Sequence, residues 1–340
     1  MKEPLFGKTL SELQVIIKQA GLPGYAAKQL AAWLYKKRVT SFEEMTNLSK
    51  KARLMLAEKY ETGLVAPRSV QTSADGTKKY LFKAGGGGYI EAAYIPETKR
   101  HTLCVSSQVG CKMNCSFCAT GKQGFQANLS AREILNQIVS IPENALLTNL
   151  VYMGMGEPLD NTEEVLKSLE ILTADWGFEW SPRKITVSTI GIIPEMKKFL
   201  ENSTCHLAIS LHNPFDDERT ALMPVNKAWP VKEIVDELKK YPFDRHRRVS
   251  FEYIVFGGLN DTPRHVNQLA RLLNGIKCRI NLIRYHNIPG SELKGTDEQR
   301  LIKFKDALNA KGITTTIRAS RGQDIDAACG LLSTKELLKE

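Results

Sequence analysis

The sequence lacks any apolar stretch long enough to cross a membrane. Among its 340 residues no run of apolar side chains approaches the roughly 18–20 residues that a transmembrane helix needs. Its N-terminus, MKEPLFGKTL, lacks the apolar segment and the small-residue cleavage site of a secretory signal. These absences predict a cytoplasmic protein that does not associate with a membrane.

Repeats, low-complexity tracts and a phosphate-binding loop are also absent from the sequence. The glycines at 85–88 are not followed by the Lys-Ser/Thr pair that completes a P-loop. Apolar residues make up 42% of the chain and charged residues 25%, which is close to the average of folded domains and excludes disordered, collagen-like and coiled-coil classes. A chain of this length has room for about two domains.

Two features of the composition point toward function. Lys and Arg number 47 against 37 Asp and Glu, a net charge of +10 that is typical of proteins that bind nucleic acid. The seven cysteines are an odd number in a chain expected in a reducing compartment. This favours metal or thiol chemistry over a disulfide framework, and four of the cysteines lie between positions 104 and 118.

The first sixty residues have helical patterns. Thr9-Leu-Ser-Glu12 is a capping box that predicts a helix start, and a second helix is predicted over 26–37. Gly21-Leu-Pro-Gly24 lies between them as a tight turn. The unit is either a plain helical hairpin or one whose turn amides dock on an RNA phosphate. Further along, Asp75-Gly76 predicts the turn of a β-hairpin.

Beyond residue 100 the chain alternates short β-branched runs with helical patterns. Such repeated βα units predict a parallel sheet with helical crossovers, although their order does not separate an open sheet from a barrel. The predicted strands are Thr102–Ser106, Asn149–Met153, Ile185–Ser188, His206–Ser210, Val249–Val255, Arg279–Ile283 and Thr314–Ile317. Helices are predicted from the capping box at Ser130 and over Glu163–Leu172, Val231–Tyr241, Pro263–Leu273 and Asp297–Ala310.

Three cysteines follow the first of these strands with the spacing C-x3-C-x2-C, at Cys111, Cys115 and Cys118. Three thiolates on one loop can bind a soft metal centre. A [4Fe–4S] cluster normally takes four thiolates, so three would leave one iron open to a substrate or cofactor. The alternative, a closed zinc site, needs a fourth ligand, for which His101 and Cys104 are the nearest candidates.

A second motif, Met-Gly-Met-Gly-Glu-Pro at 153–158, follows the next strand. Its small residues allow backbone and carboxylate to approach a ligand closely. Together the two motifs resemble the radical S-adenosylmethionine superfamily. Four further segments, Cys104–Cys111, Phe117–Gly121, Gly124-Phe125 and Ser210–Asn213, resemble the RlmN/Cfr family of radical RNA methyltransferases over nearly the whole chain.

This resemblance implies an α/β fold, a partial (β/α)6 radical barrel with a small N-terminal accessory domain of helices and a β-hairpin. The implied domains are a helical RNA-docking domain at 1–62, a β-hairpin extension and linker at 63–97, and the barrel with a C-terminal segment at 98–340. The implied partners are 23S rRNA, tRNA and an electron donor such as flavodoxin with its reductase. We expect a monomer.

The resemblance also implies cofactors and the residues that bind them. One [4Fe–4S] cluster per chain would be held by Cys111, Cys115 and Cys118, and two molecules of S-adenosyl-L-methionine would be used per turnover. One position departs from the family pattern: where relatives have a cofactor-contacting Asn this chain has His286, with Asn287 next to it, and spacing ranks His286 first. The other implied cofactor-binding residues are Gly156, Glu157, Ser188, Ser210, Leu211 and His212.

Three further residues receive catalytic roles from the resemblance. Cys329 matches the cysteine that carries the methyl group, and Cys104 matches the thiol that attacks Cys329 to release the product. The latter role calls for an accessible, activated thiol. Glu91 matches the general base that removes the proton from the adenine carbon. Cys205 and Cys278, on predicted strands without a motif, are expected to be core residues.

The leading hypothesis is therefore an adenine-C2 methyltransferase acting on 23S rRNA and tRNA. A Cfr-type enzyme that methylates adenine C8 is the alternative within the family, but members of that type carry Gln at the position of Glu91. The remaining alternative is a non-catalytic RNA-binding protein with a structural iron–sulfur cluster.

Overall fold

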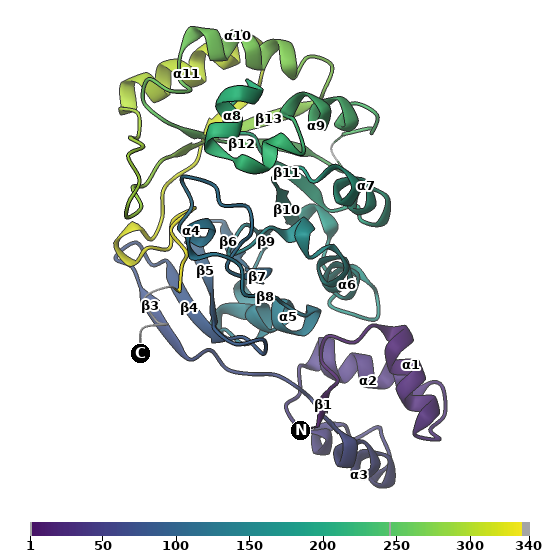
Figure 1. Ribbon diagram of the computed structural model, residues 1–340. Helices are drawn as coiled ribbons and strands as arrows, with labels where there is room; N and C mark the ends of the chain where they lie inside the picture. The colour runs from purple at the N-terminus through teal and green to yellow at the C-terminus, as the bar shows by residue number, and fades with distance from the viewer. Residues whose placement is uncertain (1, 245, 335–340) are drawn as a thin grey trace.

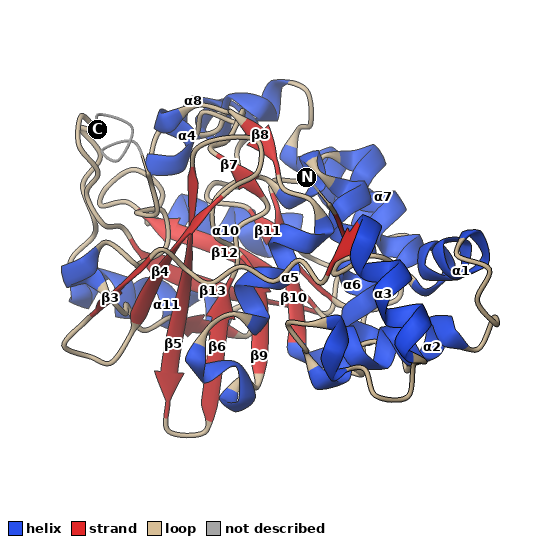
Figure 2. Ribbon diagram, turned by 90° about the horizontal axis from the view of Figure 1, so that it is seen from below, coloured by secondary structure: helices blue, strands red, loops and turns tan. Residues whose placement is uncertain are grey.

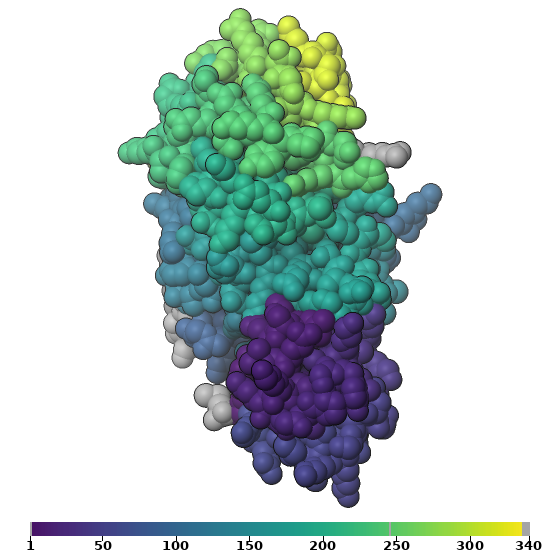
Figure 3. Space-filling model, turned by 90° about the vertical axis from the view of Figure 1, so that its right-hand side faces the viewer, coloured from purple at the N-terminus to yellow at the C-terminus, as the bar shows by residue number. Residues whose placement is uncertain are grey.

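The N-terminal residues form a small helical unit at one end of the molecule (Figures 1 and 3). The computed structural model describes residues 2–244 and 246–334; the last six residues of the expected C-terminal segment, 335–340, lie outside the described residues. The unit contains α1 (Leu10–Gln19), α2 (Ala26–Ala31) and α3 (Lys50–Lys59), and β1 (Glu3–Pro4) pairs in parallel with β2 (Tyr60–Glu61).

The capping box predicted at Thr9 is confirmed. The Thr9 hydroxyl accepts from the backbone N–H of Glu12, and the Glu12 carboxylate accepts from the Thr9 N–H at 2.7 Å. The second helix differs from the prediction, because its α-helical part ends at Ala31 and residues 32–37 form a π-helical turn. This wider turn buries three consecutive large side chains, Trp33, Leu34 and Tyr35.

Aromatic side chains join this unit to the rest of the molecule. The ring of Tyr35 lies 5.5 Å from that of Phe178 and 5.9 Å from that of Trp176, and both of these residues follow α6 (Thr162–Thr173). An ion pair of 2.7 Å between Lys167 and Glu12 adds to the contact. Burial of the aromatic rings supplies most of the stabilisation of such a junction.

A ten-stranded sheet forms the centre of the described structure, and Figure 2 shows the N-terminal helices to one side of it. Its first part is antiparallel, and the predicted hairpin at Asp75-Gly76 is confirmed, since β3 and β4 pair across that turn. The strands of this part are β3 (Ser69–Thr72), β4 (Lys78–Lys83) and β5 (Tyr89–Glu97), and β5 pairs with β6 (Arg100–Cys104).

From β6 onward all neighbouring strands in the sheet are parallel. All seven predicted strands are present; two have the predicted ends, and the ends of the others differ by at most two residues. Most residues of these strands are buried or half-buried, as expected where crossover helices cover a parallel sheet. After β6 they are β9 (Asn149–Tyr152), β10 (Ile185–Thr189), β11 (His206–Ser210), β12 (Val249–Val255), β13 (Cys278–Arg284) and β14 (Thr315–Ile317).

Helices connect these strands, and the predicted α5, α6, α9, α10 and α11 are confirmed. Three helices were not predicted: α7 (Ile193–Asn202), which has Pro194 in its first turn, and the short α4 (Ala119–Gln123) and α8 (Asp216–Leu222). No helix in the described ranges is long and apolar enough to span a membrane. The remaining elements are α5 (Ala131–Val139), α9 (Val231–Leu238), α10 (Pro263–Leu272), α11 (Glu298–Ala310), and the paired β7 (Gln108–Val109) and β8 (Ala127–Asn128).

Candidate active site

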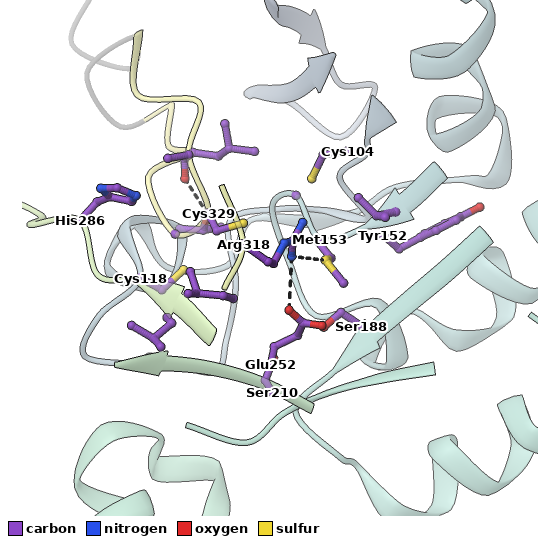
Figure 4. A pocket seen from close by; sticks show the side chains of 18 of the residues that line it. Cys104, Cys118, Tyr152, Met153, Ser188, Ser210, Glu252, His286, Arg318 and Cys329 are labelled. Atoms are coloured by element: carbon purple, nitrogen blue, oxygen red, sulfur yellow. Dashed lines mark hydrogen bonds and ion pairs between the residues drawn. The ribbon is translucent and has the colours of Figure 1, made fainter. Parts of the chain in front are cut away.

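A cavity of about 520 Å³ lies at the carboxyl ends of the parallel strands (Figure 4). Each of the seven parallel strands of the large sheet contributes to its wall, from Cys104 on β6 to Ile317 on β14. Strands six places apart in the sheet can line one cavity only if the sheet curls around it. The fold is therefore a partial barrel, and ligand-contacting residues of such barrels lie at this end.

Most of the predicted site residues meet in this cavity, although they come from positions 104 to 329. Two predicted residues do not line it: Leu211 is fully buried in the main core, and Glu91 is buried next to the cavity rather than in its wall. The residues that do line it are Cys104, Cys111, Cys115, Cys118, Gly156, Glu157, Ser188, Ser210, His212, His286 and Cys329.

The cysteine loop is held in a tight conformation. Gly110 has φ +73°, and a Cβ there would lie 1.7 Å from the carbonyl oxygen of Gly124, so only glycine fits. The Cys111 N–H donates to that same carbonyl at 3.1 Å. Cys111, Cys115 and Cys118 are free thiols, and burial raises the pKa of each, to about 12 for Cys111.

This donor set fits an iron–sulfur cluster. Three thiols in one wall of a cavity are soft ligands, and metal binding would drive their deprotonation despite the raised pKa values. Each thiolate of a cluster binds a different iron, so the sulfurs need not converge on one point. The described residues contain no group of three His, Cys, Asp or Glu side chains arranged around a single ion. His101, the candidate fourth zinc ligand, does not line the cavity and contacts Tyr94 through Nδ1 at 2.6 Å.

The Gly-Glu motif after β9 forms another part of the wall. Gly156 has φ +96°, and a Cβ there would lie 2.5 Å from Gln108. The Glu157 carboxylate accepts the backbone N–H groups of Leu159 and Ile190, each at 3.0 Å. Burial raises the pKa of Glu157 to about 7, against the opposing effect of these hydrogen bonds. A buried carboxylate with room in front of it can receive a cationic group.

His212 and His286 lie on other parts of the cavity wall. Nδ1 of His212 accepts the Ile254 N–H at 3.0 Å, and burial lowers the pKa of His212 to about 3, so its ring is neutral. His286 is half-buried, with Nε2 3.0 Å from the Ser320 hydroxyl. Asn287 is exposed and does not line the cavity, so geometry agrees with spacing in favouring His286.

The two predicted thiols of the methyl-transfer cycle face the same cavity (Figure 4). Cys329 is exposed, whereas Cys104 is buried and packs with Ala327. Burial raises the pKa of Cys104 to about 12. The expectation of an accessible, activated thiol is therefore not met at Cys104 in this conformation, because Ala327 and its neighbours cover the sulfur.

Arg318 is a functional candidate that the sequence analysis missed. It lines the cavity beyond β14, and its Nη1 lies 3.3 Å from Glu252 and 3.4 Å from the sulfur of Met153 (Figure 4). The neighbouring Cys329, followed by Glu252, raises the pKa of Arg318, and burial opposes this effect. The sequence feature that could have identified Arg318 was its position directly after the predicted strand Thr314–Ile317.

The segment that carries Cys329 is attached at both ends. Before Cys329, Asp324 accepts from the Ser73 hydroxyl at 2.5 Å, and Asp75 accepts from the Gly322 N–H at 3.0 Å. After Cys329, the Thr120 hydroxyl donates to the Leu332 carbonyl at 2.6 Å. The tip of the β3–β4 hairpin and α4 thus place the thiol over the cavity.

Glu91 lies beneath this segment. Its carboxylate forms an ion pair of 3.1 Å with Lys79 and accepts the Ser333 N–H at 3.1 Å. Burial raises the pKa of Glu91, and Lys79 opposes this effect. Cys205 and Cys278 pack in or against the core, away from the cavity, as expected.

Comparison with known proteins agrees with this geometry. The family model of the radical SAM superfamily matches residues 105–273, and that of the ribosomal RNA large subunit methyltransferase N-terminal domain matches residues 4–62. A probable dual-specificity RNA methyltransferase RlmN from Parabacteroides distasonis is 58% identical over 98% of this chain and 97% of its own. The chain belongs to the RlmN family.

Two more similar proteins support the assignment. The dual-specificity RNA methyltransferase RlmN of Syntrophus aciditrophicus is 42% identical over 97% of this chain and 96% of its own. The crystal structure of a radical SAM methyltransferase from Sphaerobacter thermophilus matches with a TM-score of 0.90 and 38% identity, covering 97% of this chain and 99% of the other. The predicted radical SAM fold, the family and the class of enzyme are thus confirmed. The family uses a [4Fe–4S] cluster and S-adenosylmethionine.

Proposed function

We propose that this RlmN-family enzyme methylates C2 of adenine in 23S rRNA and tRNA, with one [4Fe–4S] cluster per chain and two S-adenosylmethionine molecules per turnover. One observation carries the proposal: the three-cysteine loop, the Gly156-Glu157 motif and the thiols of Cys104 and Cys329 share one cavity. A non-catalytic RNA-binding protein would not need this combination of groups.

Cys111, Cys115 and Cys118 would hold the cluster, which leaves one iron for the amino-acid end of the cofactor. Glu157 would accept the cofactor's ammonium group, and Gly156 leaves room for it. Ser188, Ser210, His212 and His286 would contact the rest of the cofactor, with Leu211 acting through its backbone. When bound and reduced, the cluster and cofactor together supply a 5′-deoxyadenosyl radical, which an unreactive adenine carbon requires.

The thiols would carry and release the methyl group. Cys329, as the thiolate, would take the methyl group of a first S-adenosylmethionine, which leaves as S-adenosylhomocysteine. The methyl carbon on Cys329 would then lose a hydrogen atom to the deoxyadenosyl radical and bond to adenine C2; the adduct would give the C2 proton to Glu91 and one electron back to the oxidised cluster. Cys104, as the thiolate, then attacks the Cys329 sulfur. A disulfide forms, the sulfur–carbon bond breaks, and its electron pair stays on the carbon, which takes up a proton to become the methyl group. The disulfide must be reduced before the next turnover.

Glu91 would take the proton from adenine C2. A carboxylate can act as this base and an amide cannot, which favours C2 over C8 as the methylated carbon. Because Ser333 and Lys79 hold Glu91 in a buried position, the C-terminal segment has to move before an adenine can reach this carboxylate.

RNA binding would involve the helical accessory domain at 1–62, the hairpin extension at 63–97 and the mouth of the barrel domain at 98–340. Arg100 and Arg321 line the cavity at its mouth and supply positive charge for a phosphate backbone. We further propose a cytoplasmic monomer that receives electrons from a flavodoxin-type donor.

The decisive experiment is methylation of rRNA and tRNA fragments with a deuterated methyl donor, followed by nucleoside mass spectrometry. C2-methyladenosine is the expected product. C8-methyladenosine as the main product would replace this proposal with the Cfr-type activity. In parallel, Cys115→Ala should lose both the cluster and cofactor cleavage, and Cys329→Ala should lose RNA methylation.

A further inference from the structure

Arg219 is a buried cation that no step above uses. It lies on α8 and its side chain is 0% exposed, the largest such side chain in the described structure. An arginine is almost never fully buried unless it is paired with an acid. The described residues contain no acidic group in an ion pair with Arg219, so its burial needs another explanation.

The guanidinium binds neutral acceptors at the carboxyl ends of two strands. Its Nη2 donates to the carbonyls of Ser210 and Ile190, each at 2.9 Å, and its Nε donates to the Leu211 carbonyl at 3.0 Å. Its Nη1 donates to Oδ1 of Asn226 at 2.6 Å. These bonds fix the wall of the cavity after β10 and β11, and none of their acceptors is charged; the carboxylate of Asp216 reaches Arg219 only through Asn226, whose Nδ2 donates to it at 3.1 Å.

The cysteine loop, which would become anionic on binding a cluster, lies beside this charge. Burial lowers the pKa of Arg219 to about 10, and the nearby Cys115, followed by Asp216, opposes this effect. Arg219 therefore stays charged at neutral pH. Packing joins the two segments directly, since the Ser116 N–H donates to the Leu222 carbonyl at 2.9 Å and Cys115 lies in one apolar cluster with Met223.

We propose that Arg219 is a positioning residue whose buried charge makes the iron–sulfur cluster easier to reduce. The inference rests on the cluster assignment of the proposed function. Reduction adds a negative charge to a group in a low-dielectric site, so a nearby fixed cation stabilises the reduced state more than the oxidised one. Without this charge a low-potential one-electron donor would reduce the cluster less completely.

The test is an anaerobic redox titration of the reconstituted full-length protein, followed by electron paramagnetic resonance. Arg219→Met and Arg219→Gln remove the charge. Asn226→Asp keeps the arginine and places a carboxylate on it. Each variant that retains its cluster should be at least tenfold harder to reduce, a fall of about 59 mV for a one-electron couple.

Arg247→Met is the matched control, because Arg247 also donates to a backbone carbonyl, that of Leu200 at 2.6 Å, but the thiol that acts on its charge is Cys205 rather than one of the cysteine loop. It should keep the wild-type potential. A wild-type potential in Arg219→Met, Arg219→Gln or Asn226→Asp would overturn the inference. Loss of the cluster from all three variants would also overturn it, since Arg219 would then have a structural role alone.

The same titration separates this inference from the proposed function. A wild-type protein that binds no cluster would overturn both. A wild-type cluster whose potential is insensitive to Arg219 and Asn226 would overturn the inference and leave the proposed function standing.

Discussion

The backbone N–H of Ser333 donates to Oε2 of Glu91 at 3.1 Å. Ser333 lies four residues after Cys329, so one segment both carries the proposed methyl-carrying thiol and covers the proposed base. Movement of this segment would therefore uncover Glu91 and displace Cys329 together. The chemistry at the two residues is linked through the chain itself.

Glu91→Gln should block only the removal of the proton from adenine C2, which is a late step of the reaction. Cofactor cleavage and methylation of Cys329 should continue, because Glu91 does not line the cavity, whereas the yield of methylated RNA should fall at least about 100-fold without a base. Mass spectrometry of protein and RNA measures both. Glu97→Gln, at the cavity wall, is the control. Normal RNA methylation by Glu91→Gln would exclude Glu91 as the base.

Lys79→Met should shift the pH profile of methylation. Lys79 lowers the pKa of Glu91, against the effect of burial, so its removal raises that pKa. A base must be deprotonated, and the acidic limb of kcat/KM should therefore move to higher pH. Lys78→Met, which breaks the 2.6 Å ion pair with Glu143 instead, should leave the limb in place. An unchanged limb in Lys79→Met would separate Lys79 from the function of Glu91.

Cofactor binding should weaken as the pH falls through about 7. Burial raises the pKa of Glu157 to about 7 in the free protein, and only its ionised form attracts an ammonium group. Below that pH the affinity should approach a loss of about tenfold per pH unit. Calorimetric titration with S-adenosylmethionine measures this slope. Glu157→Gln should bind weakly with no such slope, and a slope retained in that variant would assign the effect to another group.

Gly156→Ala should lose both stability and cofactor binding. A side chain at φ +96° costs about 1–2 kcal/mol, and the contact of 2.5 Å with Gln108 adds to this. Denaturant unfolding and cofactor titration measure the two losses. Gly258→Ala shares the positive φ but meets no atom within 4 Å, so it should show the smaller loss of stability and normal binding. Equal effects in the two variants would show that the contact with Gln108 is not the cause of the losses in Gly156→Ala.

Asp324→Ala should loosen the Cys329 segment, because it removes the acceptor of the Ser73 hydroxyl and the Ala74 N–H. Trypsin should then cleave faster after Arg318 and Arg321, as followed by mass spectrometry. Asp306→Ala, on the surface of α11, should digest at the wild-type rate. If Asp324→Ala digests no faster, the hairpin tip does not hold the segment.

The sequence by itself determined the order of strands and helices, because periodicity and capping boxes are local signals: Thr9 and Ser130 begin helices as predicted. It also determined the cysteine loop and the Gly-Glu motif, whose residues are close neighbours in the chain. Local sequence patterns did not predict the π-helical turn after Ala31 or the helix α8, because tertiary packing decides the backbone conformation there.

Only the tertiary structure decided which distant residues meet. The curl of the sheet brings Cys104 and Cys329 to one cavity, and it places Arg318 beside Glu252. It also buries Arg219 beside the cysteine loop, where no acid of the described residues forms an ion pair with it. The surroundings of these two arginines depend on burial and on contacts between segments far apart in the chain, and a local pattern of residues encodes neither.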